Sequence, residues 1–424
     1  MNPLHLSGWG VKIRVRNLRS RSDLEVIDGR EDNKQSSTLR FRPRRFPYSG
    51  IIIDGHSGYV SLQAFHWLSR NKVPVFVLNY DGSLISGVLP PMPVKADLRA
   101  AQFEAYKDPA KKRRISYEIV KAKIQRSRDV LWWLAERYDI EKDRRRVDKE
   151  ALRLSQAKTI NDFRIVEGRV AQYYWQAIQS IVPESFCFQS RIIRSHQYNA
   201  SDPFNLCLNY AYGVIEGCVR KAINIVGLEP SVGFLHEFSG SQTKESLVYD
   251  LQEPFRWLGD VTTIEAFESG TLDLKDFYFT GDDYRYRIEI DAKRHFLELL
   301  KDKFNSGVRY NCKTWRWDTV ILGKTQELGR YLLGKSEGTE FVEPCPELRR
   351  SDNMEIRMRL LELTESKAKK LRVAKSTLHY LRKNARSDYS FRVSRSVSDK
   401  LSAIAGPPLA STGKSQESPN RCAG

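Results

Sequence analysis

Apolar and polar residues alternate with a period of two through most of the first ninety residues. Short runs of this kind, separated by Gly, Pro and an Asn-Tyr-Asp-Gly tetrapeptide, are typical of β-strands joined by turns. One stretch, residues 61–72, carries its apolar residues at helical spacing instead. The pattern therefore predicts an N-terminal β-domain with a small helix, and the expected strands lie within VKIRVRNL (11–18), DLEVID (23–28), TLRFRP (38–43), GIIIDG (50–55), VPVFVLNYDG (73–82) and LISGVLPP (84–91).

The period changes at about Lys95, beyond which apolar residues recur at the spacing of amphipathic helices. Pro109 is the only helix breaker in residues 96–138, and the helical pattern continues through 160–178 and 202–228. We therefore expect an α+β fold in which a larger, all-α domain follows the β-domain.

The C-terminal part begins with a polar linker and is rich in charge. Within residues 365–386, apolar side chains fall at the core spacing of a helix-turn-helix, with the turn at 372–374 and a recognition helix at 375–386. The alternative is a basic amphipathic helix that packs on the rest of the protein. The residues expected to face DNA are Lys375, Ser376, Thr377, His379, Arg382 and Lys383.

These patterns predict four parts of the chain. The expected boundaries are a β-domain at 1–95, a helical domain at 96–345, a helix-turn-helix domain at 346–395, and a disordered tail at 396–424 that is rich in Pro, Gly and Ser.

The charge of the chain narrows the class of partner. It carries 70 Lys and Arg against 52 Asp and Glu, a net charge of +18. Residues 346–424 contribute 17 basic and 8 acidic side chains, which is half of that excess. Such a balance is typical of proteins that bind nucleic acid, although basic proteins at membrane surfaces share it.

Two further features of the sequence bear on where the protein is located in the cell. No stretch reaches the roughly 20 apolar residues that span a bilayer, and the N-terminus lacks the apolar core of a signal peptide. The six cysteines follow no zinc or disulfide spacing, so we expect reduced thiols. Together these features predict an intracellular protein, which we expect in the cytoplasm.

Candidate chemistry is concentrated in the helical domain. Glu167 lies beside the apolar Val166 and Val170, and His236 ends the apolar run VGFLH, which predicts a buried strand or the start of a helix. Asp250 and Glu253 are three residues apart, and a helix from about Ser246 would place them on one face. Singly, each has an ordinary explanation as a salt-bridged glutamate, a core histidine or solvated acids. Together, two carboxylates and an imidazole match the ligands that Mg²⁺ or Mn²⁺ prefers.

Three blocks of the sequence carry a resemblance to a known family. They are EGRVAQYYWQAI, DPFNLCLNYAYGVIEGCVRKAINIVGLEPSVGFLHE and SLVYDLQEPFR, and residues 50–91 resemble the same family's β-domain. In order, the blocks resemble the signature segments of the CRISPR-associated spacer integrases, which are metal-dependent DNA endonucleases and integrases. The resemblance covers roughly residues 50–345.

The resemblance implies roles for particular residues. Glu167, His236 and Glu253 would bind Mn²⁺ or Mg²⁺, and Asp250 would support the site or take part in it. Arg256 would face phosphate or act structurally. Asn205, Asn209 and Tyr212 also match positions of the family, where we expect packing and helix contacts.

The C-terminal motif favours one branch of this family. An integrase core followed by a helix-turn-helix and a tail resembles a casposase, which inserts mobile elements, and the runner-up is an integrase of CRISPR adaptation. A third hypothesis is a helix-turn-helix protein that binds DNA without catalysis.

The resemblance also implies a mechanism and partners. A DNA 3′-hydroxyl would attack a target phosphodiester in one step, and water in its place would nick DNA. The expected partners are double-stranded DNA, as element ends and target, and further copies of the chain, in a homodimer through the β-domain or a dimer of dimers on DNA. A small CRISPR partner protein is expected only for the adaptation integrase.

Overall fold

The computed structural model describes ten segments of the chain. They are residues 3–18, 21–29, 37–55, 57–92, 95–135, 137–191, 201–236, 245–281, 285–310 and 313–341. The chain divides into two compact units, 1–346 and 347–424, and the described segments all belong to the first. The predicted helix-turn-helix and tail lie outside the described residues.

The N-terminal strands form two four-stranded sheets. In the first, with order β1-β5-β7-β8, the first three strands are parallel and β8 is antiparallel to β7. The second has the order β4-β3-β2-β6. The strands are β1 Leu4–Gly8, β2 Val11–Leu18, β3 Arg21–Ile27, β4 Thr38–Phe41, β5 Ile51–Gly55, β6 Gly58–Val60, β7 Val75–Leu78 and β8 Leu84–Val88.

Each of the six predicted segments contains or overlaps a strand, and the predicted helix is α1, Leu62–Arg70. Ser61 begins that helix by accepting a hydrogen bond from the Ala64 N–H. Strands β1 and β6 were not predicted. Apolar side chains of both sheets and α1 share one core, so these elements fold around one another.

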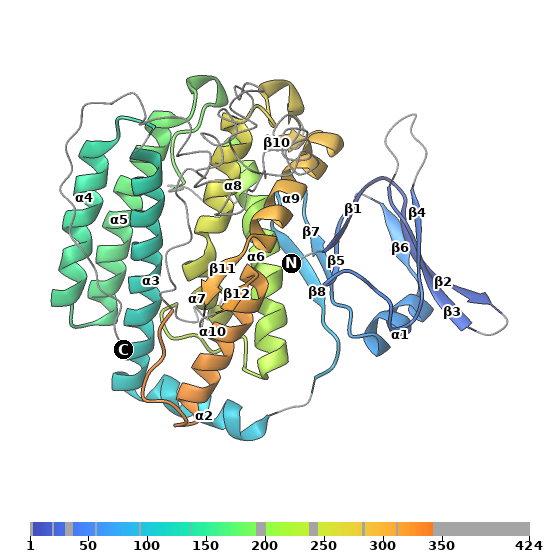
Figure 1. Ribbon diagram of the computed structural model, residues 1–424, viewed down its shortest axis with the longest axis horizontal. Coiled ribbons are helices and arrows are strands. Elements are labelled where there is room, and N and C mark those ends of the chain that lie inside the picture. Colours follow the sequence, from blue (N-terminus) through green and yellow to red (C-terminus); the bar gives the residue numbers. More distant parts are fainter. Residues whose placement is uncertain are drawn as a thin grey trace, which may run out of the picture. The chain divides into compact units, whose positions relative to one another are not determined.

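Helices make up most of the remaining described chain (Figure 1). They are α2 Ala96–Lys107, α3 Pro109–Ala135, α4 Glu141–Leu152, α5 Ile160–Ile181, α6 Pro203–Val226, α7 Ser246–Gln252, α8 Trp257–Glu268, α9 Ile290–Asn305 and α10 Trp317–Leu332, with short 3₁₀ helices at Arg153–Gln156, Glu184–Phe186, Glu253–Phe255 and Leu274–Asp276.

The predicted α+β class is confirmed. Two short hairpins interrupt the region that we expected to be helical throughout, and they pair β9 Phe277–Thr280 with β10 Arg285–Ile288 and β11 Val308–Tyr310 with β12 Lys313–Trp315.

Local capping sets where the two long central helices begin. Thr159 caps α5, and its hydroxyl and the Asp162 carboxylate each accept the other residue's backbone N–H. Asp202 caps α6 ahead of Pro203, and Gly227 ends that helix at a φ of 88°. These start points set the helical register of Glu167 on α5 and of Tyr212 on α6.

Helix α6 is buried along most of its length and packs against α7, α8, α10 and strands β7, β8 and β10. The Asn-Tyr-Asp-Gly turn between β7 and β8 rests on its backbone, where a Cβ on Gly82 would lie 2.3 Å from the Tyr210 nitrogen. Gly213 meets the same turn from the helix side, and its Cβ would lie 2.3 Å from the Gly82 carbonyl oxygen. Glycine at both positions therefore lets the first sheet approach α6 closely (Figure 1).

A buried ion pair fastens the same sheet to a second helix. Asp54 on β5 pairs with Lys293 on α9, and their side chains are only 3% and 2% exposed. Burial raises the pKa of Asp54 to about 6 although Lys293 opposes that effect. The β-strands and the helical region are thus joined by a charge pair that is shielded from water.

Two observations concern the predicted location. In the described segments, no helix is both long enough and apolar enough to cross a bilayer. Cys187, Cys207 and Cys218 are free thiols, as the sequence predicts.

We predict that Asp54→Asn lowers the free energy of unfolding by about 3 kcal/mol, because the buried Lys293 loses its counter-charge. Urea denaturation measures this change. On the same helix, Glu298→Gln removes an exposed pair with Lys301 and should cost less than about 1 kcal/mol. Equal costs for the two variants would contradict a structural role for the buried pair.

Candidate active site

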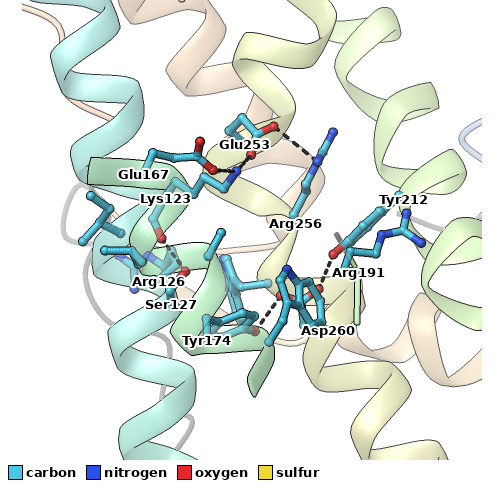
Figure 2. Close-up of a pocket in the computed structure, with 15 residues that line it drawn as sticks. Lys123, Arg126, Ser127, Glu167, Tyr174, Arg191, Tyr212, Glu253, Arg256 and Asp260 are labelled. Atoms are coloured by element: carbon cyan, nitrogen blue, oxygen red, sulfur yellow. Dashed lines mark hydrogen bonds and ion pairs between the residues drawn. The ribbon is translucent and has the colours of Figure 1, made fainter. Parts of the chain in front are cut away.

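Three segments that are far apart in the sequence bring two carboxylates to one cation. Glu167 on α5 and Glu253 at the start of the 3₁₀ helix after α7 both face the Nζ of Lys123 on α3 (Figure 2). The Lys123 ammonium donates a hydrogen bond to Glu167 Oε1 and lies 2.7 Å from Glu253 Oε2. The two predicted glutamates are therefore close enough to share one positive ion.

The surroundings of Glu253 and Lys123 favour the charged form of each side chain. Burial alone would raise the pKa of Glu253, but Arg256, Lys123 and His236 outweigh it and bring that pKa to about 2. Burial likewise acts to lower the pKa of Lys123, yet the charges of Glu253 and Glu167 raise it above its ordinary value. The carboxylates and the ammonium stabilise one another's charged forms.

Arg256 adds a second cation beside the first. Its Nη1 lies 3.3 Å from Glu253 Oε1, the oxygen that faces away from Lys123. Its guanidinium also stands over the ring of Tyr212, 5.1 Å from the ring centroid, and Arg191 contacts the same ring at 5.1 Å. The predicted phosphate-facing arginine is thus part of the site, with its side chain 30% exposed.

A hydrogen-bonded network lies directly beneath these charges. The hydroxyls of Tyr174 on α5 and Tyr212 on α6 each donate to Asp260 on α8, at 2.6 Å (Figure 2). Burial raises the pKa of Asp260 to about 6 against the effect of these donors. The network ties three helices together around a cavity of about 70 Å³ and holds the ring on which Arg256 rests.

The segment that contains His236 is built around Asp250. The sequence predicted a strand or helix start at residues 232–236; this is wrong, because these residues form a bend. Asp250 is fully buried and accepts the backbone N–H groups of Phe234, Leu235 and His236. The Asp250 carboxylate thus takes the place of the backbone carbonyl acceptors that a helix or a strand would have supplied.

The carbonyl groups of the same bend are bound by three different helices. Gln102 donates to the Val232 carbonyl at 2.7 Å, and Ser116 donates to the Phe234 carbonyl at 2.9 Å. The Leu235 carbonyl accepts a bond from Arg164 at 3.1 Å. The bend that presents His236 is therefore fixed on both sides by hydrogen bonds.

Asp250 also sets the orientation of the imidazole. Its Oδ1 lies 2.8 Å from His236 Nδ1, and since a carboxylate only accepts, Nδ1 carries the proton. His236 is 45% exposed, and its other ring nitrogen, Nε2, remains as a donor to a metal ion. Asp250 uses both oxygens within the protein, which is the geometry of an orienting residue.

The donor set is compatible with Mn²⁺ or Mg²⁺. Two carboxylates converge on one cation, and an imidazole that lowers the pKa of Glu253 lies nearby. The His236 side chain, however, does not form one three-residue cluster with Glu167 and Glu253 in the described segments. Over the described segments, no group of three or more His, Cys, Asp or Glu side chains is close enough to hold a metal ion.

Sequence patterns located some of these residues and missed others. Glu167, Glu253 and Arg256 meet, while His236 and Asp250 form the adjoining pair. Lys123 was missed because it is one of many basic residues on α3, and Asp260 because nothing in the sequence shows the two tyrosines that meet it. The predicted DNA contacts Lys375, Ser376, Thr377, His379, Arg382 and Lys383 lie outside the described residues.

Comparisons with known proteins agree on one family. Residues 32–302 match the family model described as CRISPR associated protein Cas1. A solved structure of a casposase bound to an integration product is similar to this chain, with 34% identity and a TM-score of 0.77 over 85% of this chain and 99% of the casposase.

Curated relatives agree with this match. A CRISPR-associated endonuclease Cas1 of Archaeoglobus fulgidus is 27% identical over 315 residues, which are 69% of this chain and 88% of the relative. A CRISPR-associated endonuclease Cas1 of Methanopyrus kandleri is 31% identical over 272 residues, 63% of this chain and 78% of the relative.

We predict that Asp250→Asn lowers the free energy of unfolding by about 3 kcal/mol. The side-chain NH₂ group of the new asparagine would face backbone N–H groups, and because both are hydrogen-bond donors, these contacts would be lost. His236→Ala removes one partner of Asp250 from a half-exposed position and should cost less than about 1 kcal/mol. Urea denaturation of both variants tests this difference. A small loss in Asp250→Asn would argue against its role in holding the bend.

Asp260 should make stability depend on pH. Its pKa of about 6 in the folded protein exceeds the ordinary 3.8, so folding favours the protonated acid. Its stabilising contribution is complete below pH 3.8 and is lost as the pH rises to about 6, a change of about 3 kcal/mol. The difference in unfolding free energy between wild type and Asp260→Asn should follow this course.

The control for this experiment is Asp291→Asn on the exposed side of α9. It reports what the removal of an exposed, ion-paired carboxylate does to stability over the same pH range. A difference for Asp260→Asn that does not change with pH would refute the predicted proton uptake on folding.

Proposed function

The chain belongs to the CRISPR associated protein Cas1 family, and on that premise we propose that it is a divalent-metal-dependent DNA integrase. It joins 3′-hydroxyl ends of a mobile element to target DNA by transesterification. The observation that supports this most directly is the sharing of one cation by Glu167 and Glu253, beside Arg256. Similarity to a casposase over 85% of the chain favours an integrase of that type.

Glu167, Glu253 and the Nε2 of His236 would hold Mn²⁺ or Mg²⁺. When bound, such an ion polarises a phosphate oxygen and lowers the pKa of an attacking hydroxyl. The chain's own residues then prepare the site. Asp250 keeps the imidazole in one tautomer, and the pKa of about 2 keeps Glu253 ionised at any pH near neutrality.

Arg256 is suited to bind the target phosphodiester. Its guanidinium is partly exposed and is held by the Tyr212 ring and by Glu253. In the reaction, a 3′-hydroxyl gives up its proton as its oxygen forms a bond to phosphorus, the target's own P–O3′ bond breaks, and the leaving oxygen takes up a proton, so that no proton is gained or lost overall. One phosphodiester replaces another, so the step needs no external source of energy. Water as the nucleophile would nick the target.

Assembly on DNA follows from the need for two strand transfers on opposite strands, which a two-fold assembly provides. We place the dimer contact in the N-terminal β-domain, within the proposed boundaries 1–95, and a dimer of dimers on DNA is an extension of it. Lys375, Ser376, Thr377, His379, Arg382 and Lys383 would contact the duplex from the proposed helix-turn-helix. A DNA substrate would also keep the protein at the nucleoid.

A second candidate is an integrase or endonuclease of CRISPR adaptation. It is favoured by the relatives from Archaeoglobus fulgidus and Methanopyrus kandleri, which are named CRISPR-associated endonucleases. That protein would insert spacers into a repeat array and would need a small partner protein. The same carboxylates would act in both cases, so the requirement for a partner separates the two candidates.

We predict that the purified protein joins a 3′-hydroxyl oligonucleotide to supercoiled plasmid in the presence of Mn²⁺. Glu167→Gln and Glu253→Gln should each lower the joining rate at least about a hundredfold, because each removes a negative oxygen donor. Gel analysis of labelled oligonucleotide in plasmid bands measures this. Glu265→Gln, whose carboxylate pairs with Lys303 on the surface, is the matched control and should join at the normal rate.

Filter binding of the same DNA completes the experiment. Retained binding in the glutamine variants would assign their loss to chemistry. Binding without joining in any divalent metal would favour the third hypothesis, a DNA-binding protein without catalysis. Joining only after addition of a small partner protein would favour CRISPR adaptation.

A further inference from the structure

We infer that Lys123 is a displaceable internal cation of the active site, which competes with the divalent metal for Glu167 and Glu253. In this assignment the ammonium holds the two carboxylates together until the metal binds, and it then moves away from them into solvent. The inference rests on the proposed function, because it requires that a metal bind these glutamates.

The first support is geometric. Lys123 Nζ contacts Glu167 Oε1 and Glu253 Oε2, and the second distance is 2.7 Å. A divalent cation binds carboxylate oxygens at roughly 2.0 to 2.4 Å. A metal shared by these two oxygens would occupy the space where Nζ now lies. The ammonium and the metal therefore exclude each other from this position.

The second support is the balance of charge. Glu167 and Glu253 contribute two negative charges, and Lys123 and Arg256 contribute two positive ones, so the cluster is neutral. If the metal were simply added, two positive charges would be in excess. If it replaces Lys123, one positive charge remains, which matches the single negative charge of a phosphodiester. Displacement of the ammonium thus leaves the site complementary to its substrate.

The third support is that Lys123, rather than Arg256, is free to move. Its flexible stem carries a compact charge that water solvates well, and its ion pairs in the described chain are with the two glutamates. The Arg256 guanidinium stacks on Tyr212, whose hydroxyl is bound by Asp260. A fully buried lysine of the same chain, Lys293, offers a contrast, since it is 2% exposed and joins a sheet to a helix. Figure 2 shows the Lys123 side chain reaching across from α3 to the two carboxylates.

This arrangement has a consequence for metal binding. Glu253 is buried and Glu167 is partly exposed, and without a cation the two carboxylates would repel each other, so Lys123 keeps them close together. The metal then has to compete with an intramolecular cation, and its apparent affinity falls. Removal of the ammonium should therefore strengthen metal binding and at the same time destabilise the protein in the absence of metal.

The test is calorimetric titration of Mn²⁺ into full-length protein that has been stripped with EDTA, with no DNA present. Lys123→Met should bind Mn²⁺ about tenfold more tightly than wild type, a coupling of ordinary size for competing ligands. Lys121→Met is the matched control, because that lysine lies on the same helix and pairs only with Glu118 among the ion pairs of the described chain. Its affinity should equal that of wild type.

Thermal denaturation of the same proteins provides a second readout. In EDTA, Lys123→Met should unfold several degrees below Lys121→Met, and Mn²⁺ should raise its unfolding temperature more than it raises that of wild type. Lys123→Arg, which retains the charge, should bind Mn²⁺ more weakly than Lys123→Met.

Labelling of the unmodified protein tests the displacement without any substitution. An amine-reactive acetylating reagent, followed by mass spectrometry, should modify Lys123 several-fold faster when Mn²⁺ is present. Lys121 serves as the internal reference and should react equally in both conditions.

The outcomes distinguish the inference from the function. Equal or weaker Mn²⁺ binding by Lys123→Met, together with unchanged labelling, would overturn the displacement and leave the metal-dependent integrase intact. A failure of every protein to bind Mn²⁺ would overturn both. Tighter binding that is abolished by the additional substitution of Glu167 and Glu253 by glutamine would support both.

Discussion

The candidate site depends on a single electrostatic constraint, which is that two carboxylates in a water-poor cluster need a shared cation. Glu167 and Glu253 come from different helices, and their carboxylates would repel each other if nothing neutralised them. Lys123 meets this requirement in the structure, and a divalent metal would meet it better. The positions of α3, α5 and the 3₁₀ helix at Glu253 are therefore tied to the charge that lies between them.

Three other acids of the chain are also buried, and each has a different structural role. Asp54 pairs with Lys293 and joins sheet to helix, whereas Asp250 accepts three backbone N–H groups and orients His236. Asp260 accepts two tyrosine hydroxyls and supports the ring beneath Arg256. Each acid has its own set of donors, so directed polar contacts join α5, α6 and α8 and fix the bend at His236, in addition to apolar packing.

The N-terminal sheets are coupled to this site through α6. The turn at Gly82 lies against the α6 backbone at Tyr210. Two residues further along the same helix, the ring of Tyr212 contacts Arg256. A change in how the sheets pack would therefore reach the arginine through one rigid helix. The proposed dimer contact at the sheets and the proposed chemistry at the carboxylates are thus linked through α6.

Much of the fold was predictable from the sequence, because alternation and helical spacing are local properties. They located the strands from Val11 to Val88 apart from β6, and the long helices α3, α5 and α6. The order of acids and histidine also singled out Glu167, His236 and Glu253. The sequence did not show which of these residues lie close to one another in space. Only the tertiary structure decided that Lys123 lies between the two glutamates, that Asp250 turns inward to the bend, and that Asp260 meets two tyrosines, because these contacts join segments whose spacing along the chain carries no signal.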